Sequence, residues 1–497
     1  MTEVTREALK SLAQAHRLVP LVRSLFADAE TPVGVYRKLA GGRPGTFLLE
    51  SAEPGASFSR WSFVGVNAVA TLSASGDEAV WTGSVPSGLP TSGDPLAVLG
   101  QAWRAIKSPR LPGLPPLTGG FVGYLGYDVV RRIEKLPSKA ADDLGLPELM
   151  MLLVTDLAAV DHHECRVVLI ANALVSPDMS ASELDAAYAD ALARLDAMER
   201  ALAQPAPPTV ATVEVVPPKQ AESRSAPGEY EHAVELSIEA IKAGEVFQIV
   251  PGQRFGVATS ADPLDVYRVL RTLNPSPYMY FVHLDGVDIV GSSPEALVTV
   301  HGGEATIHPI AGTRRRGETS ERDAELITEM VNDPKERAEH VMLVDLARND
   351  LGRVCEPGSV AVVEFGVVEK YQNVSHIVST VSGRVRGDLD AFDVFKSAFP
   401  HGTVTGAPKV RAMELLDEFE PVRRGIYSGA VGYMDPAGDI DMAICLRTAI
   451  MTGGMAYVQA GAGVVADSVP ALEEKETRNK ARAVLQAIAT AETLRPV

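Results

Sequence analysis

Short apolar runs bounded by turn residues recur through the N-terminal part of this chain. They predict β-strands at residues 46–49, 60–66, 68–72 and 165–170. In the second half, Asp285-Gly286 separates two apolar runs, and Gly302-Gly303 separates two more. These dipeptides are typical of β-hairpins, whose strands run antiparallel. The predicted fold class is therefore α+β, with antiparallel sheets and helices packed on them, and not a doubly wound parallel sheet.

Two predicted helices flank one boundary segment in the chain. Ser180 and Glu183 form a capping box, and the apolar residues after it fall on one helical face: Leu184, Tyr188, Leu192, Leu195 and Met198. A second helix is predicted at residues 230–243, ended by Gly244. Between the two helices, residues 203–228 contain six prolines and little periodicity, as a linker does.

Composition narrows the class of protein. Apolar residues make up 46% of the chain and charged residues 22%, which is typical of a globular protein. The net charge of −18 disfavours a general binder of nucleic acid or anionic membrane. Three widely spaced cysteines form neither a disulfide framework nor a CxxC metal site. The start of the chain lacks a signal pattern, and the longest apolar stretch is too short to span a bilayer, so we expect a cytoplasmic protein.

Two predicted helices each carry a pair of glutamates three residues apart. Asp333-Pro334 begins the first, where Glu336 precedes Glu339. The apolar centre of this helix is predicted near Met342 and Leu346, beside Ala338, and Glu339 projects about 60° from Met342.

Pro470 begins the second helix, which carries Glu473 and Glu476. A carboxylate on a buried face needs a positive partner, and Mg²⁺ would serve. On spacing alone, solvated acidic turns near helix N-termini are the simpler interpretation. Glu476 also lies well off the predicted apolar face at Ala481, Val484 and Ile488.

Two glycine-rich segments imitate nucleotide-binding loops. Gly461-Ala462-Gly463 follows a strand, and its amides suit an anion, but no second parallel strand follows as a dinucleotide site requires. Residues 401–409 lack the spacing of a phosphate loop. Asp161 to Cys165 is better read as a hairpin turn than as a metal site. Arg314-Arg315-Arg316 is equally compatible with a solvated turn and with part of an anion pocket.

Residues 230–493 resemble the chorismate-utilising enzymes. The strings that carry the resemblance include FQIVPGQRF, GSSPEALV, HPIAGTRRRG, AEHVMLVDLARNDLGRV, VSHIVSTVSG, HGTVTGAPKVRAMELLD and VQAGAGVVADSVPALEEKETRNKA. The N-terminal strings LLESAEPGASFSRWSFVG and GGFVGYLGYDVVRR are similar to the branch that contains component I of anthranilate synthase. The resemblance implies a sandwich of antiparallel sheets with helices outside. It divides the chain into a regulatory region at 1–203, a linker at 204–228 and a catalytic domain at 229–497, which share sheets.

The resemblance also assigns residues. It implies that Glu339 and Glu476 bind Mg²⁺, with Glu336 and Glu473 in the outer shell. It implies that Glu295 is a general acid, that His376 takes part in proton removal and pyruvate loss, and that Thr403 hydrogen-bonds near the departing oxygen. The implied substrate contacts are Gln248, Gly312, Thr313, Tyr427, Arg447, Gly461, Ala462 and Gly463. From the residues alone, His376 is better read as a satisfied core histidine.

The implied reaction is the first committed step of tryptophan biosynthesis. Chorismate gains ammonia at ring carbon 2, loses its 4-hydroxyl and then eliminates pyruvate to become anthranilate. Hydroxide is a poor leaving group, which calls for the acid. In the resembling family, isochorismate- and salicylate-forming members carry a lysine at the position of Gln248, and aminodeoxychorismate synthase carries one at Ala311. A neutral amide and a methyl group cannot replace those lysines.

The resemblance further implies regulation and a partner. Tryptophan would bind at a feedback site made of Leu49, Glu50, Ser51, Asn274, Pro275, Pro277, Tyr278 and Met279. No glutamine amidotransferase domain follows residue 497, so we expect a separate glutaminase subunit that supplies ammonia, in a heterotetramer. The alternatives are a chorismate aminase of the aminodeoxychorismate synthase type, which Ala311 disfavours, and a catalytically dead tryptophan-binding regulator.

Overall fold

The computed structural model describes residues 4–51, 60–206, 210–371 and 374–497. Residues 52–59 of the N-terminal string and 207–209 of the linker therefore lie outside the described residues. The elements of the N-terminal part are α1 (Arg6–Leu12), β1 (Leu18–Phe26), α2 (Pro32–Leu39), β2 (Thr46–Glu50), β3 (Trp61–Ser75), β4 (Glu78–Gly83), α3 (Pro95–Ala105), β5 (Gly120–Leu125), the 3₁₀ helix η1 (Tyr127–Arg132), β6 (Leu149–Asp161), β7 (Arg166–Leu174) and α4 (Ala181–Leu202).

The second half begins with short strands in the linker and continues with alternating strands and helices. Its elements are β8 (Ala211–Thr212), β9 (Glu222–Ser223), α5 (Glu229–Lys242), β10 (Gln248–Ile249), β11 (Gly252–Ala258), α6 (Pro263–Leu273), β12 (Tyr278–Leu284), β13 (Val287–Ser293), β14 (Ala296–His301), β15 (Glu304–Ile307), β16 (Ile310–Arg315), α7 (Ser320–Asn332), α8 (Pro334–Gly352), β17 (Ala361–Lys370), β18 (Val374–Arg384), α9 (Ala391–Ala398), η2 (Gly402–Val404), β19 (Gly406–Ala407), α10 (Lys409–Phe419), β20 (Ala430–Met434), β21 (Ile440–Ile444), β22 (Thr448–Thr452), β23 (Met455–Gly461), α11 (Pro470–Ala491) and β24 (Arg495–Pro496).

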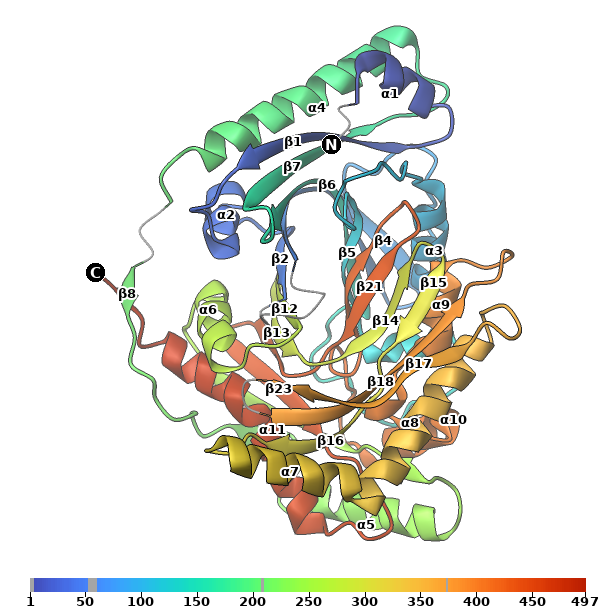
Figure 1. The fold of residues 1–497 in the computed structure, drawn as a ribbon, viewed down its shortest axis with the longest axis vertical. Helices are drawn as coiled ribbons and strands as arrows, with labels where there is room; N and C mark the ends of the chain where they lie inside the picture. Colours follow the sequence, from blue (N-terminus) through green and yellow to red (C-terminus); the bar gives the residue numbers. More distant parts are fainter. Residues whose placement is uncertain (1–3, 52–59, 207–209, 372–373) are drawn as a thin grey trace.

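The predicted α+β class is confirmed. One hydrogen-bonded sheet of 20 strands, paired antiparallel, runs through both halves of the chain. One apolar core consists of strand and loop residues only, such as Phe47 and Val282, and lies between sheet faces. Two other cores pack helices against strands, α4 and α11 in one and α3, α8 and α9 in the other. The molecule is thus a sandwich of sheet layers with helices outside, as Figure 1 shows for α1 and α4 over β1 and β7.

The sheet crosses the predicted domain boundary. β2 pairs with β12, and β5 pairs with β20, so N-terminal strands extend the sheet of the second half. Within the linker, β9 pairs with β11 and β8 pairs with the C-terminal β24. The division into three segments stays a prediction, but the two halves share backbone hydrogen bonds.

Most elements predicted from local signals are present. Ser180 caps α4 with both bonds of the capping box, Asp333 caps α8, and both predicted hairpins pair in register. The two strands predicted at 60–66 and 68–72 are one strand, β3. Its register against β6 shifts around Asn67, so the polar residue marks a β-bulge and not a turn.

The predicted apolar face of α8 is wrong by about one helical position. Ala338 is exposed and Met342 and Leu346 are only half-buried, while the buried face is centred on Leu343 and Ala347. His340 and Asp350 belong to that face because each has a polar partner. His340 Nε2 lies 2.6 Å from Ser379 Oγ on β18, and Lys409 Nζ lies 2.8 Å from Asp350 Oδ2. A prediction made from apolar residues alone leaves such hydrogen-bonded polar residues out of the buried face.

Candidate active site

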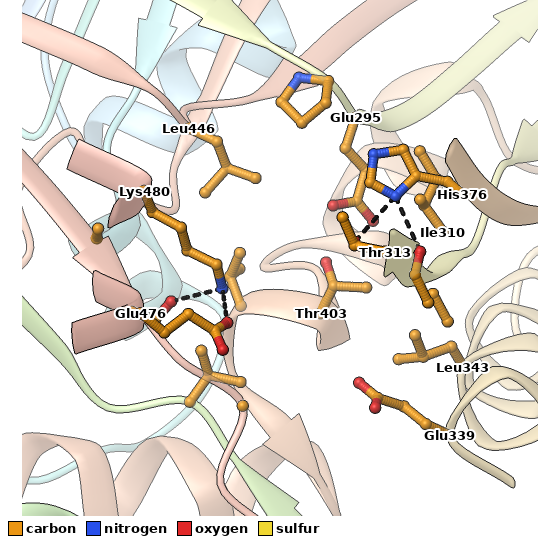
Figure 2. A pocket seen from close by; sticks show the side chains of 18 of the residues that line it. Glu295, Ile310, Thr313, Glu339, Leu343, His376, Thr403, Leu446, Glu476 and Lys480 are labelled. Carbon is orange, nitrogen blue, oxygen red and sulfur yellow. Dashed lines mark hydrogen bonds and ion pairs between the residues drawn. The ribbon is translucent and has the colours of Figure 1, made fainter. Parts of the chain in front are cut away.

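A cavity of about 470 Å³ opens where strands from the sheet meet α8 and α11. Figure 2 shows side chains from these separate elements pointing into it. The predicted site residues that line it are Gln248, Glu295, Gly312, Thr313, Glu336, Glu339, His376, Thr403, Tyr427, Arg447, Gly461, Gly463, Glu473 and Glu476. The fold therefore brings together residues that are as much as 228 positions apart, Gln248 and Glu476 (476 − 248).

Ala462 is the predicted contact that does not line the cavity. Its side chain is buried, and its N–H donates to the carbonyl of Pro251 at 3.2 Å. The flanking glycines permit close packing: a Cβ on Gly461 would lie 2.9 Å from Tyr427 Oη, and one on Gly463 would lie 2.7 Å from Gln248 Nε2. The loop thus serves the cavity through its shape more than through the Ala462 amide.

Glu295 lies between β13 and β14 with 6% of its surface exposed. Burial raises the pKa of its carboxyl to about 8, and Thr403 and Lys480 offset part of that effect. Among the described residues, its Oε1 atom has no hydrogen-bond partner. A carboxyl group in this state is protonated at neutral pH, which suits a general acid.

His376 lies on β18, opposite Thr313 of β16. A β-bulge at Gly312, whose φ is 63°, interrupts this pairing, and the Gly312 carbonyl lies 2.9 Å from His376 Nδ1. Because a carbonyl only accepts, Nδ1 carries the proton and Nε2 keeps its lone pair. Burial lowers the pKa of the imidazole, so the ring is neutral near pH 7 and Nε2 can act as a base.

The α8 carboxylates have partners on the cavity wall. Glu339 Oε1 accepts a hydrogen bond from Gln248 Nε2 at 3.0 Å, and burial raises the pKa of Glu339. Glu336 Oε1 lies 2.8 Å from Arg314 Nη1. Arg314 therefore belongs to the cavity wall. For this residue, the interpretation as part of a pocket holds and the interpretation as a solvated turn does not.

The α11 carboxylates enter from the other side. Figure 2 shows Glu476 and Glu339 on opposite sides of the cavity. Glu476 Oε1 lies 2.8 Å from Lys480 Nζ, and Glu476 is well off the buried face of α11, as predicted. Burial raises the pKa of Glu473, and nearby Glu476 raises it further.

Within residues 4–51, 60–206, 210–371 and 374–497, no group of three or more His, Cys, Asp or Glu residues is arranged to hold a metal ion. The chemistry of the donors nevertheless fits a hard cation. Glu339 and Glu473 are desolvated carboxyls with raised pKa values, and a divalent ion would favour their charged forms. Mg²⁺ needs only one or two protein carboxylates when substrate and water supply the other oxygens.

Arg447 offers positive charge, and none of the described residues forms a salt bridge with it through a carboxylate. Burial lowers its pKa, and Tyr427 and Glu476 only partly oppose that shift. Its φ of 49° places a non-glycine residue in the left-handed region, and Ser428, next to Tyr427, has a φ of 62°. Such backbone strain clusters at functional sites. The guanidinium is therefore available to a carboxylate of a bound molecule.

The sequence patterns missed several cavity residues. Lys335 and Lys480 line the cavity, and Lys480 Nζ also lies 2.9 Å from the Gly461 carbonyl. His401 lies next to Glu295, with its Nδ1 atom 3.6 Å from Glu295 Oε1. The spacing of Glu476 and Lys480, four residues apart on one helix, is the signal that could have identified Lys480.

A second cavity, of about 290 Å³, lies in the sheet between the two halves of the chain. It is lined by predicted feedback residues Leu49, Glu50, Ser51, Pro277, Tyr278 and Met279, and by Trp61, Phe63, Val300, Val431, Ile440 and Asp441 among others. Asn274 and Pro275 do not line it. Asn274 Nδ2 instead donates to Ser292 Oγ at 2.8 Å and supports the turn before β12.

Two of the carboxylates that line the second cavity, Glu50 and Asp441, differ in their partners. Glu50 accepts from Tyr267 Oη at 2.5 Å and from Arg271 Nε and Nη2 at 3.0 Å each. Burial raises the pKa of Asp441 to about 6, offset by Tyr278. Asp441 is mainly ionised at neutral pH, and Glu50 forms an ion pair with Arg271, so this cavity combines apolar walls with carboxylate groups.

Residues 45–486 match the family model described as chorismate binding enzyme. The anthranilate synthase component 1 of Mycobacterium tuberculosis is 55% identical over 99% of this chain and 96% of its own length. That of Arthrobacter globiformis is 49% identical over 98% of this chain and 93% of its own length.

The solved structures agree in fold. The crystal structure of anthranilate synthase component I from Streptococcus pneumoniae matches with a TM-score of 0.75 and 36% identity, over 86% of this chain and 92% of that one. The menaquinone-specific isochorismate synthase of Escherichia coli matches with a TM-score of 0.67 over 97% of this chain and 98% of its own. At 18% identity it shows the fold alone.

Proposed function

This chain belongs to the chorismate-binding enzyme family, in the branch of the anthranilate synthase component 1 proteins, and we propose that it converts chorismate and ammonia to anthranilate and pyruvate. The observation that carries the proposal is the pairing of a protonated acid, Glu295, with a neutral base, His376, in one cavity. The reaction needs both: an acid for the departing hydroxyl and a base for the ring proton.

Substrate binding follows from the charges of the cavity. The Arg447 guanidinium forms a two-pronged hydrogen bond to a chorismate carboxylate, and burial strengthens that attraction. Tyr427, Thr313 and the glycine loop shape the wall around the ring. Glu339 and Glu476 would hold Mg²⁺, with Glu336 and Glu473 beyond them, and the ion would supply positive charge for a second carboxylate.

Ammonia is the nucleophile in this proposal. Gln248 and Ala311 both line the cavity, and a neutral amide and a methyl group neither activate water nor attack the ring. As the bond from nitrogen to ring carbon 2 forms, the bond from carbon 4 to oxygen breaks, and Glu295 donates its proton so that water leaves. Thr403 hydrogen-bonds beside the same oxygen.

Aromatisation follows in the same cavity. His376 Nε2 removes the proton from ring carbon 2 while the bond from carbon 3 to the enolpyruvyl oxygen breaks. The electron pair of the C–H bond completes the aromatic ring, and the released enolpyruvate takes up a proton to become pyruvate. The hydrogen bond from Nδ1 to the Gly312 carbonyl supports the imidazolium that forms.

The proposal includes partners and regulation. A separate glutamine amidotransferase subunit supplies ammonia in a heterotetramer, and tryptophan binds the second cavity as feedback inhibitor. The apolar walls there suit an indole ring, and the charge of Glu50 and Asp441 suits an ammonium group.

The three cysteines are free, which supports a reducing compartment such as the cytoplasm. In the part of the chain that the structure describes, no helix combines the length and apolarity that a membrane crossing requires.

The test is turnover by the purified chain with chorismate, Mg²⁺ and an ammonium salt. We expect blue anthranilate fluorescence and an equal amount of pyruvate, and both at least about a hundredfold more slowly when E295Q replaces the native chain. A stable amino-deoxy product without pyruvate would overturn the assignment in favour of a chorismate aminase. Tryptophan binding without any turnover would identify a regulator with a dead site.

A further inference from the structure

A buried ion pair lies behind the wall of the active-site cavity, and the mechanism above does not use it. Glu420 follows α10, Arg424 comes four residues later, and only 6% and 2% of their surfaces are exposed. Arg424 Nη2 lies 2.6 Å from Glu420 Oε1, and Arg424 Nε lies 2.9 Å from Glu420 Oε2. Neither residue lines the cavity, so any effect on the reaction must pass through the residues that the pair contacts.

Arg424 uses all five of its N–H donors. Two of them bond to Glu420. The other three donate to the Val250 carbonyl at 2.6 Å, the Val404 carbonyl at 2.6 Å and Ser428 Oγ at 3.4 Å. The guanidinium thus joins three segments of the chain that are far apart in the sequence.

Each of these three segments reaches the cavity. Val250, Val404 and Tyr427 line it. Figure 2 shows Thr403, the residue before Val404, pointing into the cavity. The centroid of the Tyr427 ring lies 5.6 Å from Arg424 Cζ, within the range of a cation–π contact. Arg424 therefore contacts both Tyr427 and the segment that carries Thr403.

Glu420 supports the surface on which the Tyr427 ring rests. Glu420 Oε1 accepts the N–H of Gly252 at 2.8 Å. A Cβ on Gly252 would lie 3.2 Å from Tyr427 Cε1, so this glycine packs against the ring. The Val250 N–H also donates to the Thr405 carbonyl at 3.0 Å, which ties two of the wall segments together directly. The ring and the neighbouring segments are thus held by one network of hydrogen bonds.

We propose that Glu420 and Arg424 are a pair of positioning residues that fix Tyr427 and Thr403 relative to each other, so that chorismate binds in the orientation from which its hydroxyl leaves. This inference rests on the proposed function for its catalytic meaning, but the network itself does not. A displacement of about 1 Å in an active site can lower a rate about a hundredfold, so the wall needs a rigid support. Lysine has the charge of arginine but not its planar fork of five donors, so it cannot replace Arg424.

The experiment compares R424K with R194K, which both keep the charge and remove the fork. Arg194 is the matched control because its three nitrogens bond within the N-terminal part, to partners that line neither cavity: Asp156, Asp190 and Asn172. With ammonium salt, we expect R424K to lower kcat/KM for chorismate about a hundredfold and R194K to stay within about twofold of the native value. A folded R424K within about threefold of the native value would overturn the proposal.

A second variant covers the case in which R424K does not fold, which thermal unfolding establishes. The double variant E420Q/R424Q removes both charges together, so no unpaired charge is left buried. We expect the same loss of kcat/KM, because glutamine has two N–H donors in place of the five of arginine. A native kcat/KM in the folded double variant would contradict the role of the pair.

A double-mutant cycle with Y427L separates positioning from a general structural role. Y427L removes the ring and its hydroxyl while keeping apolar volume, so it leaves nothing for Arg424 to position at that point of the wall. We expect R424K to raise the KM of chorismate about tenfold in the native background and less than about twofold in Y427L. The loss of kcat, which passes through Val404 to Thr403, should remain in both backgrounds. An equal rise of KM in both backgrounds would mean that R424K only disturbs the fold, and the proposal would fail.

Amide hydrogen exchange reports on the network without turnover. The N–H groups of Val250 and Gly252 are bonded to Thr405 and Glu420, so they exchange when the network opens. We expect R424K to speed exchange in the peptide that contains them about tenfold, and R194K to leave it unchanged. If the native chain makes no anthranilate but exchange speeds up as expected, the proposed function fails and the positioning role stands. If turnover of the native chain is normal and exchange in R424K equals that of the native chain, the positioning role fails and the proposed function stands.

Discussion

The active-site cavity and the second cavity each contain a carboxyl group whose pKa is raised by burial, but the two groups differ in charge at neutral pH. Glu295, with a pKa of about 8, keeps its proton, whereas Asp441, with a pKa of about 6, has mostly lost it. One cavity therefore holds an acid and the other an anion. The same desolvation thus produces a catalytic group in one place and a recognition group in the other.

The partners of the charged groups differ in the same way. In the second cavity, Glu50 is fully engaged by Tyr267 and Arg271. In the active-site cavity, Arg447 has no carboxylate partner among the described residues, and Glu339 has only the amide of Gln248. Buried charges without counterions cost stability unless a ligand completes them. The comparison predicts that changes in the first cavity abolish turnover and that changes in the second alter only ligand response.

The largest effect is expected from the carboxylates assigned to the metal. Glu339→Ala or Glu476→Ala should reduce Mg²⁺-dependent turnover on the order of a thousandfold while leaving the fold intact. Steady-state kinetics against Mg²⁺ concentration, with circular dichroism for folding, measures this. Glu474→Gln is the matched control, because Glu474 lies on α11 but pairs with Arg478. Full activity in either alanine variant would refute the metal assignment.

Glu295→Gln should lower kcat by about a hundredfold to ten-thousandfold. The amide keeps the shape of the carboxyl group but has no proton of suitable acidity, so chorismate should still bind. In the native chain, kcat relative to free ammonia should fall as pH rises through about 8, because the acid form is lost there. Stopped-flow measurement of substrate binding separates the two effects. A variant that loses binding and rate together would contradict the role of acid.

His376→Ala should impair pyruvate elimination about a hundredfold and amination less. The base for ring carbon 2 is gone, while the acid remains. The aminated intermediate should therefore accumulate, which chromatography of a timed reaction detects. His376→Gln, which keeps a donor to the Gly312 carbonyl but no base, should behave similarly. An unchanged product ratio in both variants would argue against the division of roles.

In the second cavity, Glu50→Gln should raise the tryptophan concentration needed for inhibition about tenfold, with kcat within about twofold of the native value. The amide oxygen can still accept from Tyr267 Oη and Arg271 Nε, while the charge and the hydrogen bond from Arg271 Nη2 are lost. Inhibition curves with ammonium as nitrogen source measure the change without the partner subunit. A variant that loses turnover while its inhibition by tryptophan is unchanged would contradict the assignment of turnover to the first cavity and of ligand response to the second.

The smallest effect concerns Asp441. Because its pKa is raised to about 6, its charge is present above that pH and is lost as pH falls through it. Tryptophan binding should therefore weaken about threefold below pH 6 in the native chain, and Asp441→Asn should remove that pH dependence. Calorimetric titration at several pH values tests this. The same pH dependence in the variant would assign it to another group.

Local signals in the sequence were sufficient for many elements. The capping box at Ser180, the Asp333-Pro334 start and the two glycine turns each involve contacts within a few residues, so they could be predicted without knowledge of the fold. The motifs also identified many of the residues that line the active-site cavity, although the roles of those residues stay predictions. Asn67 shows the limit: a polar residue in a strand is a turn or a bulge depending on its partner strand.

The sequence by itself determined the α+β class, the helix starts and the hairpins, and its motifs named many, but not all, of the residues that line the cavity. Only the tertiary structure decided the rotation of α8, the loss of the Ala462 amide to Pro251, and the joining of three wall segments by Arg424. These depend on desolvation and on the direction of hydrogen bonds between segments far apart in the chain. Whether a carboxyl is an acid or an anion is a property of what surrounds it, and a linear sequence does not record its surroundings.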